Sequence, residues 1–531
     1  MSRWQRILFG AVAALAEGAA LAEGAALAEP LPRITPQAAY AEIARSGELR
    51  GLQIDGDLDV AKMQPPSGAS RIVMQDVQLA GSLHSSAAGP AVALWIDRSR
   101  LRDVDLRGTR WSAALAIENS TVTNRAWFDG AQFDAAFTLH ASTFSGQTLF
   151  RGVRFAAPVE ITSSQFQPAP PMRSSISFTD ARFAAPARFD RSSFGTDVRF
   201  DTSRFEADAS FLGLTVTGRA SWRNVIFGGD AEFRFCRLGD ADFGDAEQMS
   251  VFMHLADFRG CTMGSLRLDY ADVRGDMLLV NVRVMPGDLT LKQASLRGAR
   301  NDFSGLQVAG RLDLQGAQIG NLQMQWFEIG PALLRSEPGS DVLRPVQRRL
   351  EELKKDDEAR EASAVLADRV IHERLARPDS SVADKALLWV ERIVWGGATG
   401  YGTRLGRIVG VALSCWVILA LPLVFNRSAR IGALRGDADK APPLHQPVAL
   451  EALQPPPASA TARALQSLAY AFALMFTLPD LRLRPAEPMS AAMRGYLLFM
   501  RGAGLGLLAL MALTLTKVSP VIQAVLGKIV G

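Results

Sequence analysis

The chain has 531 residues, which is longer than a single hydrophobic core usually supports, so we expect two or more structural parts. Its 58 Lys and Arg residues nearly balance 54 Asp and Glu residues, and this net charge of +4 does not indicate nucleic acid as a partner. Three cysteines are too few for a disulfide framework. Cys236 and Cys261 either form one bridge or fill small core positions, and Cys415 lies in an apolar run.

Residues 1–28 have the pattern of an export signal. Two arginines lie within Met1–Arg6, an apolar stretch follows at 7–16, and the triplet Ala-Leu-Ala occurs three times, the last ending at Ala28. Small residues in this arrangement are typical of cleavage sites, so we predict a signal peptide that ends at Ala28 or at an earlier triplet. The alternative is an uncleaved anchor helix, which needs about twenty apolar residues, more than this stretch contains.

Residues 29–95 are predicted to form an N-terminal cap and the first coils of a repeat region. A short amphipathic helix that contains Ile43 should end at Gly47, because glycine commonly terminates helices. Ile54 and Leu58 would then begin the first coil. We expect the helix to cover the end strand, which would otherwise expose unpaired backbone groups.

From about residue 96 to 330, large apolar residues recur at intervals that alternate between five and six. Neither the helical period nor the strand period produces this pattern. A period of this length that recurs so often is typical of a solenoid, in which each unit buries its apolar face by stacking on its neighbours. The series runs through Phe128, Phe133, Leu139, Phe144, Phe150, Phe155, Ile161, Phe166, Phe178, Phe183, Phe189, Phe194, Phe200, Phe205, Phe211, Val216, Trp222, Phe227, Phe233 and Leu238.

Short motifs within the series carry a family resemblance. The segments that begin at Ala241, Ala256, Ala271 and Ala294 read Ala-Asp-Phe-Gly-Asp, Ala-Asp-Phe-Arg-Gly, Ala-Asp-Val-Arg-Gly and Ala-Ser-Leu-Arg-Gly. They resemble the A(D/N)LXX repeat of pentapeptide-repeat proteins. This resemblance implies a mainly β fold, a right-handed quadrilateral β-helix over residues 96–330 with about four repeats per coil. The alternating spacing departs from strict fives, and we interpret it as an added residue at alternate corners.

A proline-rich gap and the charge of the repeat region refine this prediction. The gap from Gln167 to Ser177 contains three prolines and predicts a loop that leaves the coil without breaking the core. Some family members mimic DNA with a strongly acidic rod, but residues 128–330 carry 20 basic and 23 acidic side chains. The predicted rod is therefore close to neutral, which argues against DNA mimicry.

Residues 331–380 are predicted to form an α-helical hairpin. Apolar residues with helical spacing line two segments, and we expect Asp356 or Asp357 to be the N-cap of the second helix. The two helices are candidates for the C-terminal cap of the solenoid. Their apolar positions are Leu343, Val346, Leu350 and Leu353, then Val365, Leu366, Val370 and Leu375.

Residues 381–531 are predicted to form a helical membrane domain. Segments 408–425 and 496–516 are apolar and long enough to span a bilayer. The loop between them holds more Lys and Arg than the outer flanks, which places the loop in the cytoplasm and the repeat region on the periplasmic side of a bacterial inner membrane. The short apolar segment 464–478 is interpreted as an interfacial or re-entrant helix, with a third span as the alternative. Small residues suited to close helix contact occur at Gly502, Gly504 and Gly506.

Two sequence features of the membrane domain invite comparison with known proteins. Trp389 to Gly402 before the first span, Ala464 to Leu481 and the Gly-rich second span resemble uncharacterised bacterial membrane proteins that join pentapeptide-like repeats to a two-span tail. The resemblance implies no established activity, although such chains sometimes bear the label membrane-associated oxidoreductase. Thr399-Gly400-Tyr401-Gly402 is similar to a potassium-channel filter, but it precedes the first span, whereas a filter follows the pore helix.

No catalytic, cofactor-binding or metal-binding residues are predicted. His372-Glu373 lacks the second histidine of a zinc-protease motif. Asp240, Asp242 and Asp245 are close enough in sequence to suggest calcium, but such aspartates in a pentapeptide coil usually face solvent. The five histidines are scattered, with surface positions expected, at His84, His140, His254, His372 and His445.

These observations favour a membrane-anchored periplasmic scaffold without catalysis. We expect it to contact the lipid bilayer and to bind a protein or cell-envelope partner along the faces of the rod. The second hypothesis is a channel- or transporter-like membrane protein that the rod regulates. The third is a membrane-associated oxidoreductase with no recognisable cofactor motif.

Overall fold

A computed structural model describes residues 31–86, 88–167, 176–378, 381–397, 400–401, 405–425, 431–435, 443–455, 457, 459–477 and 482–518. The chain divides into two compact units, Met1–Pro338 and Gly339–Gly531, and each is described by itself. The predicted signal peptide, residues 1–28, lies outside the described residues.

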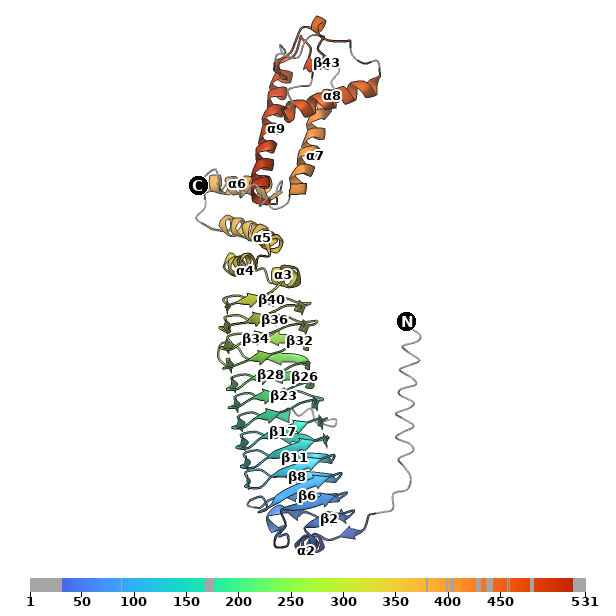
Figure 1. The fold of residues 1–531 in the computed structure, drawn as a ribbon, viewed down its shortest axis with the longest axis vertical. Helices are drawn as coiled ribbons and strands as arrows, with labels where there is room; N and C mark the ends of the chain where they lie inside the picture. The colour runs from blue at the N-terminus through green and yellow to red at the C-terminus, as the bar shows by residue number, and fades with distance from the viewer. Residues whose placement is uncertain are drawn as a thin grey trace. The chain divides into compact units, whose positions relative to one another are not determined.

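The first unit begins with a helix, α2 (Pro36–Ser46), at one end of the strand stack (Figure 1). Thr35 is its N-cap and accepts a hydrogen bond from the Ala38 backbone N–H, and Gly47 terminates it with a φ of 75°. Ile43 is buried against the first strands. The predicted helix and its glycine end are therefore confirmed.

Residues 33–323 form a solenoid in which every described strand pair is parallel. One sheet contains one strand from each turn (Figure 1). Because this sheet has thirteen strands, the solenoid has thirteen turns. These strands are β2 (Glu48–Arg50), β5 (Arg71–Gln75), β7 (Ala93–Asp97), β10 (Leu115–Glu118), β13 (Phe137–His140), β17 (Val159–Thr162), β21 (Ala187–Arg188), β25 (Ala209–Ser210), β28 (Ala231–Glu232), β31 (Ala256–Asp257), β34 (Met277–Leu278), β38 (Asn301–Asp302) and β42 (Leu322–Gln323).

A second sheet of nineteen strands occupies two positions in each turn. In some turns one long strand fills both positions, and in others two short strands do so. The strands are β1 (Arg33–Ile34), β3 (Gln53–Ile54), β4 (Leu58–Asp59), β6 (Gln78–His84), β8 (Arg100–Asp105), β11 (Thr121–Trp127), β14 (Thr143–Phe144), β15 (Gln147–Leu149), β18 (Gln165–Phe166), β19 (Ile176–Ser177), β22 (Ser193–Phe194), β23 (Val198–Arg199), β26 (Thr215–Ser221), β29 (Arg237–Asp242), β32 (Thr262–Arg267), β35 (Arg283–Val284), β36 (Leu289–Thr290), β39 (Gln307–Val308) and β40 (Leu312–Asp313).

A third sheet of ten strands completes the turns, so a full turn carries four strand positions. Its strands are β9 (Arg110–Trp111), β12 (Gln132–Phe133), β16 (Arg154–Phe155), β20 (Arg182–Phe183), β24 (Arg204–Phe205), β27 (Ile226–Phe227), β30 (Val251–Phe252), β33 (Asp272–Val273), β37 (Ser295–Leu296) and β41 (Gln318–Ile319). The predicted β-solenoid is confirmed, while its right-handedness and quadrilateral cross-section stay predictions.

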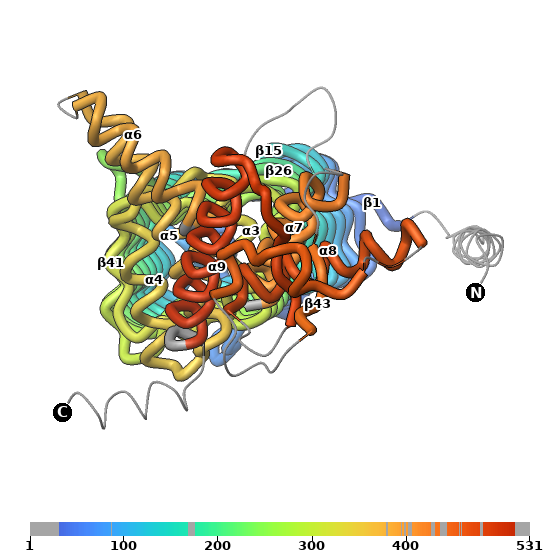
Figure 2. The backbone as a smooth tube through the Cα atoms, turned by 90° about the horizontal axis from the view of Figure 1, so that it is seen from above, coloured from blue at the N-terminus to red at the C-terminus, as the bar shows by residue number. Residues whose placement is uncertain are grey.

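The predicted apolar series forms the core, because all twenty of its members are buried. A typical turn places each side chain over its equivalent 22 residues later, as in the pairing of Phe133 with Phe155. Aromatic rings therefore stack along the axis, and the Phe183 and Phe205 ring centroids are 4.5 Å apart with parallel planes. Seen along the stack, successive turns lie over one another (Figure 2).

The proline-rich gap leaves the core continuous, as predicted. Phe150 stacks on Phe178 with ring centroids 4.6 Å apart, and Phe166 stacks on Phe194 at 4.8 Å. Gln165 pairs in register with Ser193. The strand ladder therefore resumes in register after the gap, whose residues 168–175 lie outside the described part of the chain.

Helix α3 (Trp326–Arg335) covers the last turns of the solenoid (Figure 1). Its Arg335 donates from Nε to the Gly310 carbonyl at 2.7 Å, and the Glu328 carboxylate accepts the Gly305 N–H at 2.8 Å. Trp326 and Leu333 are buried. This helix was not predicted, and it overlaps the end of the predicted repeat region and the start of the predicted hairpin.

The second unit is helical. Helices α4 (Ser340–Glu352) and α5 (Asp356–Leu375) pack on each other. The predicted aspartate N-cap is wrong, because Lys355 occupies the N-cap position and Asp356 and Asp357 lie in the first turn, where their charge favours the helix dipole. The remaining elements are α6 (Val382–Glu391), the π-helical turn η2 (Arg392–Gly397), α7 (Leu405–Phe425), β43 (Ile431–Ala433), the short turn η4 (Leu450–Ala452), α8 (Ala460–Met475), β44 (Leu483–Pro485) and α9 (Ala491–Val518).

Two helices, over Gly406–Phe425 and Ala491–Leu515, are long and apolar enough to cross a membrane. The shorter α8 packs against both α7 and α9. The Trp416 indole N–H donates to the Leu468 carbonyl at 3.0 Å, and the Tyr496 hydroxyl donates to the Leu419 carbonyl. In the chain, β43 and β44 lie between α7 and α9, and the two strands pair antiparallel.

Candidate functional site

The three aspartates whose spacing suggested calcium, Asp240, Asp242 and Asp245, do not surround a common cation position. Asp242 is buried at 5% exposure, so the expectation that it faces solvent is wrong. Its carboxylate accepts Arg223 Nη2 at 2.6 Å, and Asp245 lies 3.7 Å from the same guanidinium. Asp240 instead accepts the Ser265 hydroxyl at 2.7 Å. The arginine thus occupies the place between two of the carboxylates, and within the described residues no group of three His, Cys, Asp or Glu is arranged to hold a metal ion.

The histidines are spread over both units. His140, His254 and His372 are exposed, whereas His84 and His445 are half-buried. The His140 ring nitrogen contacts the Thr162 hydroxyl one turn away at 2.9 Å. The predicted scatter is confirmed.

Cys236 and Cys261 are free and buried, so the core alternative is confirmed and the disulfide alternative is wrong. Each thiol donates to a backbone carbonyl of the preceding turn, Cys236 to Phe211 at 3.0 Å and Cys261 to Phe233 at 2.6 Å. Burial raises the pKa of Cys236. These contacts make the two thiols structural groups in an apolar interior.

The thiols lie at the same position of the turn as a column of buried serines, with Leu214 between Ser192 and Cys236. The Ser142 hydroxyl accepts the Ser120 N–H at 3.1 Å and donates to the Ile117 carbonyl at 3.1 Å. Because each hydroxyl links neighbouring turns, it satisfies backbone groups that lie between two strands and have no strand partner. We call Ser99, Ser120, Ser142, Ser164 and Ser192 the serine column.

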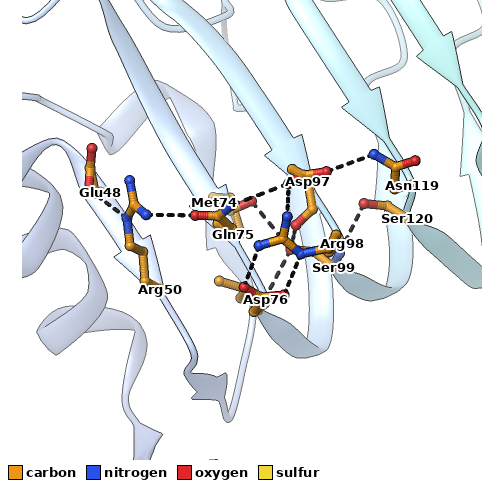
Figure 3. A network of polar contacts seen from close by, with 11 residues as sticks. Glu48, Arg50, Met74, Gln75, Asp76, Asp97, Arg98, Ser99, Asn119 and Ser120 are labelled. Atoms are coloured by element: carbon orange, nitrogen blue, oxygen red, sulfur yellow. Dashed lines mark hydrogen bonds and ion pairs between the residues drawn. The ribbon is translucent and has the colours of Figure 1, made fainter. Parts of the chain in front are cut away.

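A polar network connects the surface of the first turns (Figure 3). The Arg98 guanidinium bridges Asp76 at 2.9 Å and Asp97 at 3.0 Å. Asp97 is buried and also accepts the Asn119 side-chain amide at 3.0 Å. The hydrogen bond from Arg98 holds the pKa of Asp76 below its ordinary value. Acidic and basic groups therefore neutralise each other here and join successive turns.

A groove crosses the nineteen-stranded sheet near Arg219. It consists of two hollows of about 270 and 410 Å³ that share Asp197 and Arg219. Their walls come from four successive turns, and we call them the Arg219 groove. The residues that line it are Asp197, Val198, Arg199, Asp201, Thr217, Gly218, Arg219, Ser221, Arg223, Gly239, Asp240, Gln248 and Gly264.

Glycines form the floor of the more open hollow. A Cβ on Gly239 would lie 2.4 Å from the Gly218 carbonyl oxygen, and a Cβ on Gly264 would lie 2.3 Å from the Gly239 oxygen. The turns approach so closely that a side chain has no room. Gly287 and Gly310 continue this glycine column. Where the glycines of the column line the groove, its surface is formed by backbone atoms.

The charges in the Arg219 groove are partly free for a ligand. Arg199 and Arg219 are exposed and form no ion pair within the described residues. Asp197 accepts the Arg219 backbone N–H at 2.8 Å through one carboxylate oxygen. The Ser221 hydroxyl donates to Asp201 Oδ1 at 2.5 Å. The groove thus offers both donors and acceptors to a polar partner.

The Arg219 groove and the serine column were not predicted, although both leave a signal in the sequence. Glycines recur once per turn from Gly218 to Gly310, and serines recur once per turn from Ser99 to Ser192. A search for identical small residues at the coil period, in place of large apolar ones, would have found them.

Tyr401 of the filter-like tetrapeptide lies at a turn and is bonded to α5. The Tyr401 hydroxyl donates to Asp368 of α5 at 2.9 Å, and Arg392 of η2 donates to the same carboxylate at 3.0 Å. Burial, and then the hydrogen bond to Asp368, raise the pKa of Tyr401. These contacts tie the segment before α7 to α5.

Large apolar side chains are exposed on α6 and η2, directly before α7. They recur with the spacing of one helix face, and tryptophan among them is typical of membrane interfaces. The exposed residues are Val382, Leu387, Trp389, Val390, Ile393 and Val394. Such a face is costly in water and suits the edge of a lipid bilayer.

The packing of α8 on α9 uses one of the three predicted glycines. A Cβ on Gly504 would lie 2.0 Å from the Met475 carbonyl oxygen, so glycine is required there. A Cβ on Gly502 or on Gly506 would have no neighbouring atom within 4 Å. The close contact lies in a cluster that contains Tyr470, Leu474, Met475, Leu497 and Met500.

The comparisons with known proteins add no assignment to this picture. No family model, curated protein or solved structure matches the chain.

Proposed function

We propose that the chain is a membrane-anchored scaffold of pentapeptide-repeat type, without catalysis, whose solenoid binds a protein or cell-envelope partner. The observation that carries the proposal is the Arg219 groove, a polar recess on a continuous β-solenoid in a chain that also holds two apolar helices of spanning length. Regular ladder faces present many equivalent polar groups, and binding surfaces of solenoids are commonly of this kind.

We propose further that the solenoid lies on the periplasmic side of a bacterial inner membrane. The predicted signal peptide and the excess of Lys and Arg between the two apolar helices support this orientation independently. Alkaline phosphatase fused after residue 340 should be active, and the same enzyme fused after residue 440 should be inactive. The reverse pattern would overturn the orientation.

The binding role is tested by placing a photo-crosslinking amino acid at position 219 of the full chain in native membranes. We expect a discrete adduct from position 219 and none from position 188, an exposed arginine on the thirteen-stranded sheet. Equal adducts from both positions, or none from either, would contradict a partner in the Arg219 groove.

A channel-like function is the second candidate, because one observation favours it. The short helix α8 packs between two helices of spanning length, and its C-terminal end meets α9 at Gly504. Ion flux through liposomes that contain the purified chain would support this candidate, and flux no greater than that of empty liposomes would remove it.

A further inference from the structure

Several arginines in the loop after the first apolar helix and in the first turns of the second have no acidic partner among the described residues. We call residues 431–435, 443–455 and 482–501 the basic segment. Arg435, Arg482, Arg494 and Arg501 form no ion pair within the described residues. The described acidic residues of this segment, Glu451 and Glu487, are exposed. Among the described residues, the segment therefore carries more positive charge than its ion pairs neutralise.

The half-buried Arg501 is held in place by an imidazole. Its Nη1 lies 2.8 Å from His445 Nδ1. Because a guanidinium only donates hydrogen bonds, Nδ1 must accept and the imidazole must be neutral. Burial, and then the charge of Arg501, lower the pKa of His445, which agrees with a neutral ring. The contact therefore orients the guanidinium and leaves its charge uncompensated.

Neighbouring elements fix the chain around His445. The Tyr470 hydroxyl of α8 donates to the Leu444 carbonyl at 2.7 Å, and the Val448 N–H donates to the Pro485 carbonyl of β44 at 3.0 Å. On α9, Arg494 lies seven residues before Arg501 and so on the same face, about 10 Å away along the axis. Two guanidinium groups and one oriented imidazole thus face one side of the helix.

We propose that Arg494 and Arg501, with His445 as a positioning residue, bind the phosphate of an anionic phospholipid headgroup. The proposal rests on the proposed membrane anchoring. A guanidinium presents paired donors that match two phosphate oxygens. Arg501 lies within an apolar stretch, Ala491–Leu515, where an uncompensated charge is costly and a headgroup anion is within reach of a long side chain. Its place in this stretch favours a lipid over soluble phosphate.

The test measures which lipids stay bound to the full chain. The chain is reconstituted in vesicles of phosphatidylcholine and phosphatidylglycerol, extracted in mild detergent, and examined by native mass spectrometry. We expect retained phosphatidylglycerol, with about tenfold lower occupancy in Arg501→Gln because a charge-assisted hydrogen bond is lost. His445→Ala should lower occupancy less, and His445→Gln should restore it, because its amide oxygen can accept from Arg501. Arg311→Gln, in the solenoid, should change nothing.

Failure of the anchoring and failure of the lipid site give different results. If alkaline carbonate releases the wild-type chain from the vesicles, the proposed anchoring is wrong. If the chain stays in the vesicles but retains both lipids equally, or if Arg501→Gln behaves as Arg311→Gln does, the lipid site alone is wrong. Displacement of phosphatidylglycerol by inorganic phosphate would overturn the assignment to a lipid.

Discussion

In the solenoid each buried side chain packs against its own equivalent one turn away, whereas in the helical unit each contact occurs once. Phe189 stacks on Phe211, which stacks on Phe233, and the same geometry recurs along the coil. In the helical unit, Gly504 meets the Met475 carbonyl and Tyr496 meets the Leu419 carbonyl at single places. Repetition therefore makes the solenoid predictable from spacing, while the helical unit depends on individual contacts.

The two regions also treat charge and apolar surface differently. In the solenoid, many arginines pair with a carboxylate of a neighbouring turn, as Arg151 does with Asp129 at 2.7 Å. In the described part of the helical unit, Arg435 and Arg494 have no such partner, and apolar side chains such as Ile418 and Phe499 are exposed. A surface of this kind suits lipid better than water.

The strongest test of repeated packing removes one ring from a stack. Phe200→Ala should lower the free energy of unfolding by about 3 to 5 kcal/mol, because Phe200 is buried among five aromatic neighbours. Denaturant unfolding followed by circular dichroism measures the change. Phe235→Ala is the control, since Phe235 is 64% exposed and should lose little. Equal losses in both variants would contradict the stacked core.

Single-contact packing is tested by a matched pair of glycines on α9. Gly504→Ala should destabilise the helical unit by about 3 kcal/mol, because the obstacle to the new Cβ is backbone and cannot turn aside. Gly502→Ala should be neutral, since no heavy atom of another residue lies within 4 Å of its Cβ position. Thermal unfolding in detergent compares the two variants. If Gly502→Ala lowered the unfolding temperature more than Gly504→Ala, α8 would not approach α9 as described.

The serine column offers a smaller test within the solenoid. Ser142→Ala should cost about 1 to 2 kcal/mol, because the buried Ser120 N–H loses its acceptor. Ser142→Cys should cost less, since Cys236 and Cys261 already fill equivalent positions. Hydrogen exchange of the Ser120 amide reports the local opening. If the Ser120 amide exchanged at the same rate in Ser142→Ala, the hydroxyl would not bridge the two turns as proposed.

Acid should produce the smallest change, through the surface pairs of the solenoid. The hydrogen bond from Arg107 lowers the pKa of Asp105, and that from Arg98 lowers the pKa of Asp76. These carboxylates stabilise the fold above the ordinary carboxyl pKa of about 4, and the contribution is lost as pH falls through their lower folded values. The Tm of the solenoid should therefore fall in this acidic range. In a double variant, Arg98→Gln with Arg107→Gln, the Tm should fall less steeply with decreasing pH. The same dependence of Tm on pH as in the wild type would contradict a stabilising role of these two pairs.

Sequence spacing predicted the solenoid, its core and the end of the first helix because these features depend on local periodicity. It predicted the wrong environment for Asp242, since its partner Arg223 lies on the preceding turn and becomes a neighbour only when the register is known. The Arg219 groove was missed for the same reason, because its walls come from four turns. Helix α3 was missed because Trp326 ends the repeat pattern and begins the helix at once.

The two helices that close the solenoid, α2 and α3, also determine how long it can become. A parallel ladder with open ends could be extended by a second rod, as a fibre grows by adding strands. Here α2 packs beside β2 at one end and α3 packs on β39 and β40 at the other. Each helix therefore covers part of the ladder at its end and opposes the end-to-end addition of another rod, and the thirteen turns encoded in the gene set the length of the solenoid.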